Sequence, residues 1–219
     1  MGRHRLAVVI PCHNEASTLA AVVEGVAGEA DVIVVDDRST DGSREIAAAR
    51  GARVLAADSP GYDGALDTGL RRALADGYDW VVTLDADGEH DPALVADFLE
   101  RLAQDVPLVC GIRPHPQRAA EYLVAVTGRA LFGIRDLLCG MKGYSRAVLQ
   151  QHYASGAPLA VNMAPAIGWR RAGGAFAEVP VHGTPRTDRP RFARALAANR
   201  RILMSFLAAL ARSGRRAGG

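Results

Sequence analysis

Apolar and polar positions follow two different rhythms along the first half of this chain. Short runs rich in Val, Ile and Leu predict buried strands at residues 6–10, 31–35, 52–55, 80–83 and 108–112. Apolar residues at helical spacing predict helices at about 17–27, from about 41, at 67–76 and at 92–102, the last with Asp91 as its N-cap. This alternation predicts an α/β fold with a mostly parallel central sheet flanked by helices.

The pattern loosens beyond Pro116. Helices are predicted at 119–132, 145–153 and 162–172, and a short strand is predicted at 176–181. Residues 191–212 predict a long helix that carries most of its large apolar residues on or near one face: Phe192, Leu196, Leu203, Phe206, Leu207 and Leu210. We therefore expect a main domain over residues 1–190 and a basic amphipathic helix with a tail over residues 191–219.

The composition is that of a globular protein. Of the 219 residues, 49% are hydrophobic and 23% are charged, which suits one domain with a sizeable core. Cys12, Cys110 and Cys139 have neither metal-ligand nor paired spacing, so we expect buried thiols in a reducing compartment. No signal peptide is recognisable, and no apolar run reaches the roughly 18 residues of a membrane span. No G-x-G-x-x-G or P-loop pattern occurs, so the sequence does not indicate those modes of nucleotide binding.

Charge is distributed unevenly along the chain. The formal net charge is +2, yet residues 186–219 contain nine Arg and one Asp, a local charge of +8, which leaves −6 for the remainder. A basic tail on an acidic body indicates an anionic partner such as a phospholipid surface. The alternative is an ordinary solvated helix face.

The most informative motif is Leu84-Asp85-Ala86-Asp87-Gly88, directly after the predicted strand at 80–83. Two carboxylates one residue apart at the end of a strand offer hard oxygen ligands to a divalent cation, and open α/β sheets bind ligands at such ends. An EF-hand loop is excluded because it needs its Gly at the sixth position, whereas this Gly is fourth. An aspartate-nucleophile phosphatase would normally have Thr where Glu89 stands. A plain polar turn is the remaining alternative.

Five segments occur in a recognisable order: residues 9–15 (Val-Ile-Pro-Cys-His-Asn-Glu), 34–42, 85–90, 110–113 and 136–144. In that order they resemble the motifs of family 2 inverting glycosyltransferases with the GT-A fold, and most of all those of the dolichol- and polyprenyl-phosphate mannosyl- or glucosyltransferases. The resemblance runs from about residue 6 to about residue 191. It implies that residues 1–190 form a GT-A catalytic domain.

For such an enzyme the resemblance implies a nucleotide pocket and a metal ion. Polar groups at adjacent strand ends can accept hydrogen bonds from base N–H groups and ribose hydroxyls. Asp87, with Glu89, would hold Mg²⁺ or Mn²⁺, which neutralises charge on the leaving diphosphate, and Asp85 would either help to hold the metal or contact the ribose or sugar. Alternatively, the acidic pair at 36–37 only caps and solvates a loop. The residues expected to shape the pocket are Pro11, Asn14, Glu15, Asp36, Asp37 and Asp85.

The acceptor decides the subclass. A phosphate is already ionised at neutral pH and needs cations to orient it rather than a general base. Arg113, Arg129 and Arg186 match family positions for binding it, and Lys142 could assist. Surface ion pairs are the alternative reading of the first two arginines. A hydroxyl acceptor would require a carboxylate base, and Asp136 stands where other family members have theirs.

The chain departs from the family pattern in three ways. Tyr62 and Asp63 replace the Lys and the second Gly of a segment usually written Gly-Lys-Gly-x-Ala, which removes a cation near the nucleotide and adds an anion. Gly140 replaces a Ser that is common in the lipid subgroup. Many lipid-linked members carry added transmembrane helices, and this sequence shows none. Its Arg-rich last helix could instead lie in a membrane interface, pack on the catalytic domain or pair with another subunit.

We therefore predict a metal-dependent enzyme that moves a hexose from a GDP-mannose- or UDP-glucose-type donor to a polyprenyl or dolichyl phosphate. Asp87, Asp136 and Arg113 are the expected catalytic residues. The rival predictions are transfer to a hydroxyl of a soluble acceptor, with Asp136 as base, and a non-catalytic nucleotide-sugar-binding subunit. We expect a cytoplasmic location with peripheral contact on the cytoplasmic face of the membrane. No nucleic-acid partner is expected, and a homodimer stays open.

Overall fold

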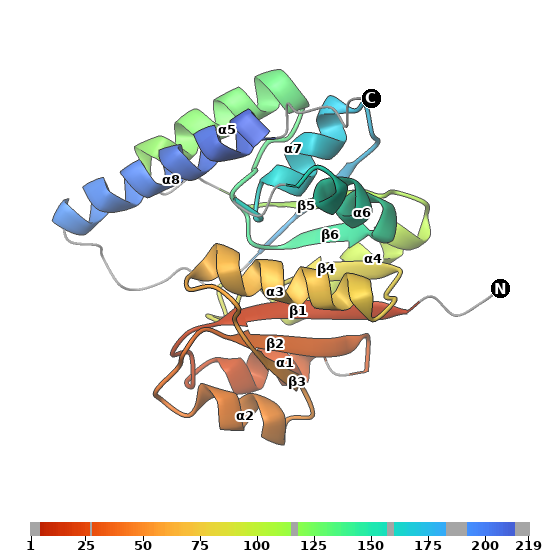
Figure 1. The fold of residues 1–219 in the computed structure, drawn as a ribbon, viewed down its shortest axis with the longest axis vertical. Coiled ribbons are helices and arrows are strands. Elements are labelled where there is room, and N and C mark those ends of the chain that lie inside the picture. The colour runs from red at the N-terminus through yellow and green to blue at the C-terminus, as the bar shows by residue number, and fades with distance from the viewer. Residues whose placement is uncertain (1–4, 27, 115–117, 157–159, 183–191, 213–219) are drawn as a thin grey trace.

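The computed structural model describes residues 5–26, 28–114, 118–156, 160–182 and 192–212, with side chains in the last stretch described from 198 to 211. A seven-stranded sheet in the order β3-β2-β1-β4-β6-β5-β7 forms the centre of the molecule (Figure 1). β6 runs antiparallel to β4 and β5, and the other neighbouring strands are parallel. The strands are β1 (Leu6–Cys12), β2 (Asp31–Asp36), β3 (Arg53–Ala56), β4 (Trp80–Thr83), β5 (Leu108–Ile112), β6 (Lys142–Ser145) and β7 (Ala177–Pro180).

Helices cover both faces of the sheet. The helices are α1 (Leu19–Val26), α2 (Ser43–Ala49), α3 (Tyr62–Ala75), α4 (Val95–Ala103) with a 3-10 turn at Pro92–Leu94 before it, α5 (Ala119–Phe132), α6 (Arg146–Ala154), α7 (Ala164–Arg171) and α8 (Phe192–Arg212). α8 lies beside α5 and also touches α7 (Figure 1). In the described part of the chain no helix is both long and apolar enough to cross a membrane.

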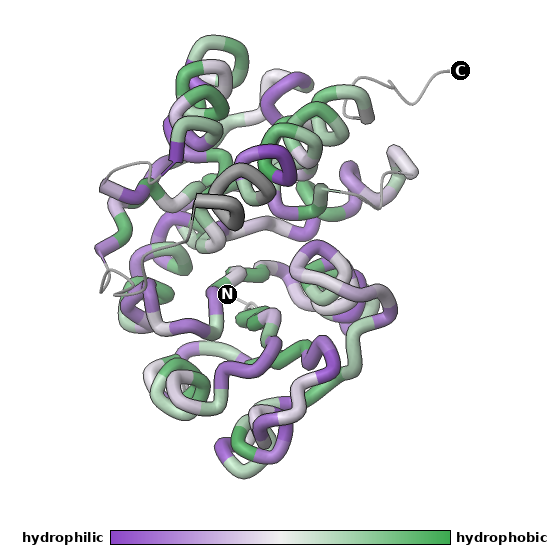
Figure 2. The backbone as a smooth tube through the Cα atoms, turned by 90° about the vertical axis from the view of Figure 1, so that its left-hand side faces the viewer, coloured by the Kyte–Doolittle hydropathy of each residue, from purple (hydrophilic) through white to green (hydrophobic). Residues whose placement is uncertain are grey.

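The core consists of two layers that the sheet separates. Side chains of β1 alternate between them, because successive residues of a strand point to opposite faces. Ala7 and Val9 belong to the layer that also holds residues of α3, α5, α6, α7 and α8, whereas Val8 and Ile10 belong to the layer that holds residues of α1, α2 and α4. Figure 2 shows apolar and polar residues alternating along the helices, as expected for helices with one face on a core. The expected α/β class is therefore confirmed.

Most predicted elements are present within a few residues of their expected ends. Asp91 is an N-cap as expected, since its side chain accepts a hydrogen bond from the backbone N–H of Ala93. The prediction for α3 was wrong at its start, because the helix begins at Tyr62, five residues before the expected position. Pro60, Gly61 and Gly64 had indicated a longer loop. α1 begins at Leu19, two residues late.

β6 was not predicted at all. Its sequence, Lys142-Gly143-Tyr144-Ser145, is short and has no apolar run. It is extended because it lies between β4 and β5 and completes the hydrogen bonding of both. A partner on each side, rather than local propensity, makes these four residues a strand.

The packing of α3 on the sheet predicts opposite effects for two helical glycines. A Cβ at Gly69 would lie 2.3 Å from Cγ1 of Val9 and 3.0 Å from Cγ2 of Val35, whereas a Cβ at Gly168 in α7 would meet nothing within 4 Å. Gly69→Ala should lower the free energy of unfolding by about 1–3 kcal/mol through overpacking. Gly168→Ala should raise it by up to about 1 kcal/mol through helix propensity. Urea unfolding measures both changes, and equal effects of the two variants would contradict this packing.

Candidate active site

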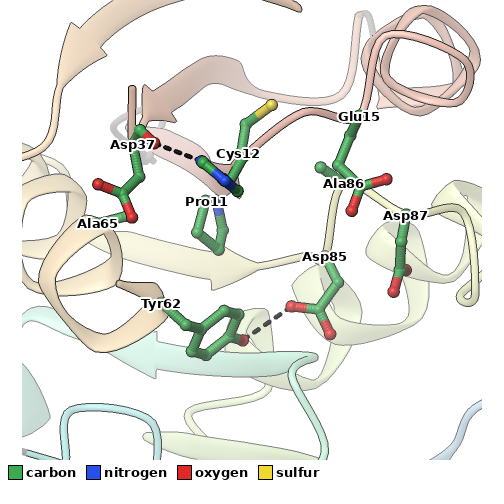
Figure 3. A pocket seen from close by; sticks show the side chains of 10 residues that line it. Pro11, Cys12, Glu15, Asp37, Tyr62, Ala65, Asp85, Ala86 and Asp87 are labelled. Carbon is green, nitrogen blue, oxygen red and sulfur yellow. Dashed lines mark hydrogen bonds between the residues drawn. The ribbon is translucent and has the colours of Figure 1, made fainter. Parts of the chain in front are cut away.

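The carboxyl ends of β1, β2 and β4 meet at one edge of the sheet and surround a pocket of about 260 Å³ (Figure 3). Parallel strands bring these ends together, because they all run in the same direction. Four of the lining side chains are carboxylates that come from three separate segments of the chain. The lining residues are Pro11, Cys12, His13, Glu15, Asp37, Tyr62, Ala65, Asp85, Ala86 and Asp87.

Two of the residues predicted for the pocket hold its wall instead of lining it. Asn14 adopts a left-handed conformation with φ 56°. Its N–H donates to Oγ of Ser39 at 3.0 Å, and its Oδ1 accepts from the N–H of Thr40 at 2.8 Å. Asp36 is buried, and its Oδ1 accepts from the N–H of Ser39 at 3.2 Å. These contacts fix the loop after β1 against the loop after β2, so both residues shape the pocket from behind.

Asp37 and Glu15 do line the pocket. Asp37 accepts the backbone N–H of Gly61 at 2.6 Å through Oδ2 and the Arg38 guanidinium at 2.9 Å through Oδ1. Gly61 directly precedes α3, so this bond ties the start of that helix to β2. The N–H of Glu15 donates to Oγ of Ser43 at 2.9 Å, which holds the β1 loop against the start of α2.

Asp85 lies at the centre of the pocket, beside the phenol of Tyr62. The hydroxyl of Tyr62 donates to Oδ1 of Asp85 at 2.8 Å, and the two side chains point toward each other in Figure 3. Burial and the nearby negative charge of Asp87 raise the pKa of Asp85, whereas the bond from Tyr62 opposes this rise. Nε2 of His90 lies 3.9 Å from Oδ2 of the same carboxylate.

Asp87 follows two residues later, on a turn that the neighbouring loops hold in place. Its Oδ1 accepts the backbone N–H of Glu89 at 3.0 Å. Thr18 at the start of α1 donates its hydroxyl to the carbonyl of Ala86 at 2.8 Å. Gly88 has φ +72°, a conformation that residues with a side chain rarely adopt. These hydrogen bonds and the conformation of Gly88 thus fix the turn that places Asp87 in the pocket wall.

The carboxylate oxygens of this turn suit a divalent cation whose remaining coordination positions are filled by a bound ligand. Among the described residues, no three His, Cys, Asp or Glu side chains converge closely enough to form a complete metal site. Mg²⁺ is usually held by one or two carboxylates together with waters and substrate phosphates. Asp87, with Asp85 or Glu89, supplies that number of carboxylates, so a diphosphate would have to contribute the remaining oxygens. The grouping of all three as metal ligands stays a prediction.

A second, larger hollow of about 520 Å³ adjoins the same turn. It lies between α1 and the start of α4, and Gly88 is in its wall. The residues around it are Ser17, Thr18, Ala21, Val22, Gly88, His90, Asp91, Pro92 and His182.

On the acceptor side, the structure joins Arg113 and Asp136 in a bidentate ion pair. Nε and Nη2 of Arg113 lie 2.8 and 3.1 Å from the two oxygens of Asp136. Asp136 also accepts the backbone N–H groups of Arg113, Leu138 and Cys139. Burial opposes its ionisation, but the hydrogen bonds and charge of Arg113 outweigh that effect and lower the pKa of Asp136. Arg113 also lies 3.7 Å from the buried carboxylate of Glu121 on α5.

The other three predicted acceptor residues are not brought into this pair. Arg129 is exposed on α5, eight residues and about 12 Å along the helix axis beyond Glu121. Arg186 lies outside the described residues. Lys142 is fully buried in β6, where its ammonium group donates to the carbonyl of Cys139 and, at 2.8 Å, to Oδ1 of Asn162. Burial lowers the pKa of Lys142. This geometry shows Lys142 holding the loops together, and the expectation that it could assist in binding the acceptor stays a prediction.

Sequence reasoning missed four lining residues, Cys12, His13, Ala65 and Ala86, the last of which lies inside the acidic motif, and it also missed the role of Tyr62. Cys12 and His13 lie inside the first motif, between two residues that we did assign, so their position in the loop was the available signal. Ala65 matches the Ala of the family segment in which Tyr62 and Asp63 are departures, so that alignment was the available signal. Tyr62 was noted as a departure, but nothing in the sequence indicated that its hydroxyl would reach Asp85.

Comparison with known proteins agrees with this picture. Residues 7–126, more than half of the chain, match the family model described as "Glycosyl transferase family 2". The chain also resembles a solved structure of glucosyl-3-phosphoglycerate synthase from Mycobacterium tuberculosis in complex with Mn²⁺, UDP and phosphoglyceric acid. That match has a TM-score of 0.73 at 24% identity and covers 99% of this chain and 81% of the other. It confirms the GT-A type of fold.

Two curated relatives show how far the similarity extends in sequence. An uncharacterized glycosyltransferase of Mycobacterium tuberculosis is 34% identical over 113 residues, which are 52% of this chain and 50% of that protein. The undecaprenyl-phosphate mannosyltransferase of Micrococcus luteus is 29% identical in an alignment of 167 positions, which covers 67% of this chain and 68% of that protein. The chain thus spans about half the length of one relative and about two thirds of the other.

Proposed function

This chain belongs to glycosyl transferase family 2, and from that premise we propose that it transfers a hexose from a nucleotide-sugar to the phosphate of a polyprenol. The observation that carries the proposal is the pocket at the ends of β1, β2 and β4, which the carboxylates of Glu15, Asp37, Asp85 and Asp87 line together. In the proposed complex, Glu15 and Asp37 would face a base and ribose, and Asp87 would face a cation with its diphosphate. A GDP- or UDP-linked sugar has this arrangement of groups.

The comparisons support the donor class. The solved structure with a similar fold was obtained with Mn²⁺ and UDP, and another structure of the same synthase contains Mg²⁺ and UDP at 25% identity. In this chain, a bound cation would neutralise negative charge on the departing diphosphate. Asp87 would hold that cation, and Glu15 and Asp37 would accept hydrogen bonds from the nucleoside. Asp85, held by Tyr62, would face the sugar.

The state of Asp136 favours a phosphate acceptor over a hydroxyl. A general base must be free to take a proton, and its pKa should lie near the working pH. Asp136 is paired with Arg113, accepts three backbone N–H groups, and has a lowered pKa. It is therefore a weak base whose charge fixes the arginine. A phosphate needs no base, and the Arg113 guanidinium is suited to bind it in line with the anomeric carbon.

An exposed apolar surface supports a lipid as the rest of the acceptor. Among residues with described side chains, six of the seven large hydrophobic side chains that are exposed lie on α5 or α8. They are Tyr122, Leu123, Val126 and Leu131 on α5 and Met204 and Leu207 on α8, which we call the α5–α8 surface. These helices lie side by side at the upper left of Figure 1. Apolar patches of this kind mark interaction sites with membranes or proteins.

The charges around the α5–α8 surface favour a membrane over a second copy of the chain as its partner. Arg129, Arg200 and Arg201 are exposed on the same two helices. Glu121, the acidic residue of α5, is buried, and residues 192–212 contain no Asp or Glu. Two copies joined through this surface would bring arginines against arginines, whereas an anionic phospholipid surface would neutralise them. α5 also carries Glu121 to Arg113, so the surface leads to the acceptor pair.

The rival functions remain distinct in what they require. Transfer to a soluble hydroxyl acceptor needs Asp136 to release Arg113 and take up a proton. A non-catalytic subunit would bind the nucleotide-sugar without turnover. Purified protein with metal, donor and a short polyprenyl phosphate separates that case from the proposal, because only an enzyme forms the glycosylated lipid.

Replacing Asp87 tests the donor site. Asp87→Ala should abolish transfer and also the thermal stabilisation that UDP or GDP gives in the presence of Mn²⁺, because a ligand that binds only the folded state must stabilise it. Circular dichroism should show an intact fold. Asp97→Ala, on the exposed side of α4, is the matched control and should retain both properties. Turnover like that of the wild type in the Asp87 variant would contradict the metal assignment.

Replacing Asp136 separates the two acceptor classes. Asp136→Asn keeps an oxygen for the loop N–H groups but removes the charge that fixes Arg113. We expect turnover with a polyprenyl phosphate to fall by less than about tenfold, whereas loss of a general base costs on the order of a hundredfold or more. Steady-state rates measure this difference. Asp31→Asn, at the opposite end of β2, controls for the loss of one charge.

Vesicle binding tests the α5–α8 surface. Combined Leu123→Glu and Leu207→Glu changes should reduce binding to phosphatidylglycerol vesicles by about tenfold or more, because they place charge where apolar contact is needed. Co-sedimentation measures the bound fraction. Combined Ala48→Glu and Ala49→Glu changes on exposed positions of α2 add the same charge elsewhere and should have little effect. Equal losses in the two double variants would show general electrostatics rather than this surface.

A further inference from the structure

The Asp85 carboxylate is enclosed from two directions by residues that the family motifs do not predict. On one side the hydroxyl of Tyr62 donates to its Oδ1 at 2.8 Å. On the other side it packs against the backbone of Gly140, where a Cβ would lie 2.0 Å from Oδ2 and 2.5 Å from Cγ. No side chain at position 140 can coexist with the present position of Asp85. The carboxylate is therefore clamped between a phenol and a bare backbone.

The two halves of this clamp are themselves fixed. Tyr62 is the first residue of α3 and follows Gly61, whose φ is +89° and whose N–H is bound by Asp37 at 2.6 Å. The carbonyl oxygen of Gly140 accepts a hydrogen bond at 2.6 Å from the hydroxyl of Thr83, which is the last residue of β4. The hydrogen bond to Asp37 thus fixes the position at which α3 begins, and the hydrogen bond from β4 fixes the position of the backbone at Gly140. Both restraints act on the same carboxylate.

The side chain of Tyr62 is not part of the buried core. Tyr62 is 41% exposed, and its ring forms part of the pocket wall (Figure 3). A single residue separates Asp85 from Asp87 in the sequence, and two like charges so close repel each other. A neutral hydroxyl donor stabilises the carboxylate without adding a cation that would compete for the diphosphate.

The position of Asp85 indicates which part of the donor it meets. Asp87, on the metal side, would face the diphosphate. Gly140 lies in the segment that begins at Asp136 and therefore borders the acceptor pair with Arg113. The transferred sugar must lie between diphosphate and acceptor, which is the side on which Asp85 contacts Gly140. Asp85 is the lining carboxylate that touches both regions.

We propose that Tyr62 is a positioning residue which, together with Gly140, holds the Asp85 carboxylate against the sugar ring of the donor and so sets affinity for the sugar beyond that for the nucleotide. This inference rests on the proposed function, because it assumes a nucleotide-sugar in the pocket. It assigns to the two departures from the family motif one shared physical task.

The test compares sugar-bearing and sugar-free nucleotides. Tyr62→Phe removes only the hydroxyl. Dissociation constants with Mn²⁺ are measured calorimetrically for UDP and UDP-glucose, and in parallel for GDP and GDP-mannose. We expect Tyr62→Phe to weaken binding of the nucleotide-sugar by about tenfold, as for loss of one hydrogen bond to a charged group, and to leave the nucleoside diphosphate within about twofold. Gly140→Ala should show the same selectivity, because it displaces the carboxylate.

Two further variants distinguish positioning from a general structural role. Tyr78→Phe removes a similar bond, from Tyr78 to Oδ2 of Asp31 at 2.7 Å at the opposite edge of the sheet, and should leave all four affinities unchanged. In an Asp85→Ala background, Tyr62→Phe should cause no further loss, because its effect acts through that carboxylate.

Two results would overturn the inference while leaving the donor class standing. One is equal weakening of nucleotide and nucleotide-sugar in Tyr62→Phe, and the other is a full additional loss in the Asp85→Ala background. Absence of binding by all four nucleotides to the wild-type protein would instead overturn the proposed function, and the inference with it.

Discussion

Negative charge gathered at one edge of the sheet is the constraint on which the rest of this structure depends. Parallel strands bring Glu15, Asp37, Asp85 and Asp87 to one pocket from three segments. Such a group is stable only if each carboxylate has donors or a cation nearby. The described donors include a backbone N–H for Asp37, a phenol for Asp85 and a turn N–H for Asp87. This gathering of carboxylates makes the pocket suited to a metal-bound diphosphate.

The antiparallel strand β6 joins the half of the molecule that carries the Asp85–Asp87 pocket to the half that carries Arg113 and Asp136. It lies between β4, which leads to Asp85 and Asp87, and β5, which leads to Arg113. Its first residue is Lys142, the single lysine of the sequence, and the ammonium group of this lysine is buried between loops. Asp85 and Asp136, one from each half, both lie close enough to oppose the fall in the pKa of that lysine. A buried cation here connects the two acidic regions that the proposed reaction must bring together.

Ion pairing on the acceptor side and apolar exposure on α5 and α8 belong to one arrangement. Glu121 is buried in the first turn of α5 and lies 2.9 Å from Arg118 and 3.7 Å from Arg113. The same helix carries four of the exposed large side chains of the α5–α8 surface. Glu121 therefore links the helix that carries this surface to the arginine that is proposed to bind the acceptor phosphate.

Local patterns in the sequence were enough to predict much of this protein. The period of apolar residues located the parallel strands and most helices, and Asp91 was correctly identified as an N-cap. Of the pocket residues predicted from strand-end motifs, Pro11, Glu15, Asp37 and Asp85 line one pocket together with Asp87, whereas Asn14 and Asp36 lie behind its wall. Parallel topology brings strand ends together whatever the details of packing. Their chemical roles stay predictions.

Only the tertiary structure decided the contacts between distant segments. β6 is a strand because two neighbours offer hydrogen bonds, and Lys142 is buried for the same reason. The pairing of Asp136 with Arg113, the reach of Tyr62 to Asp85, and the meeting of α5 with α8 join residues 23 to more than 70 positions apart. Periodicity and spacing describe what a residue does within its own element. Which side chains then meet depends on how the elements pack, and that is fixed by the whole core rather than by any local pattern.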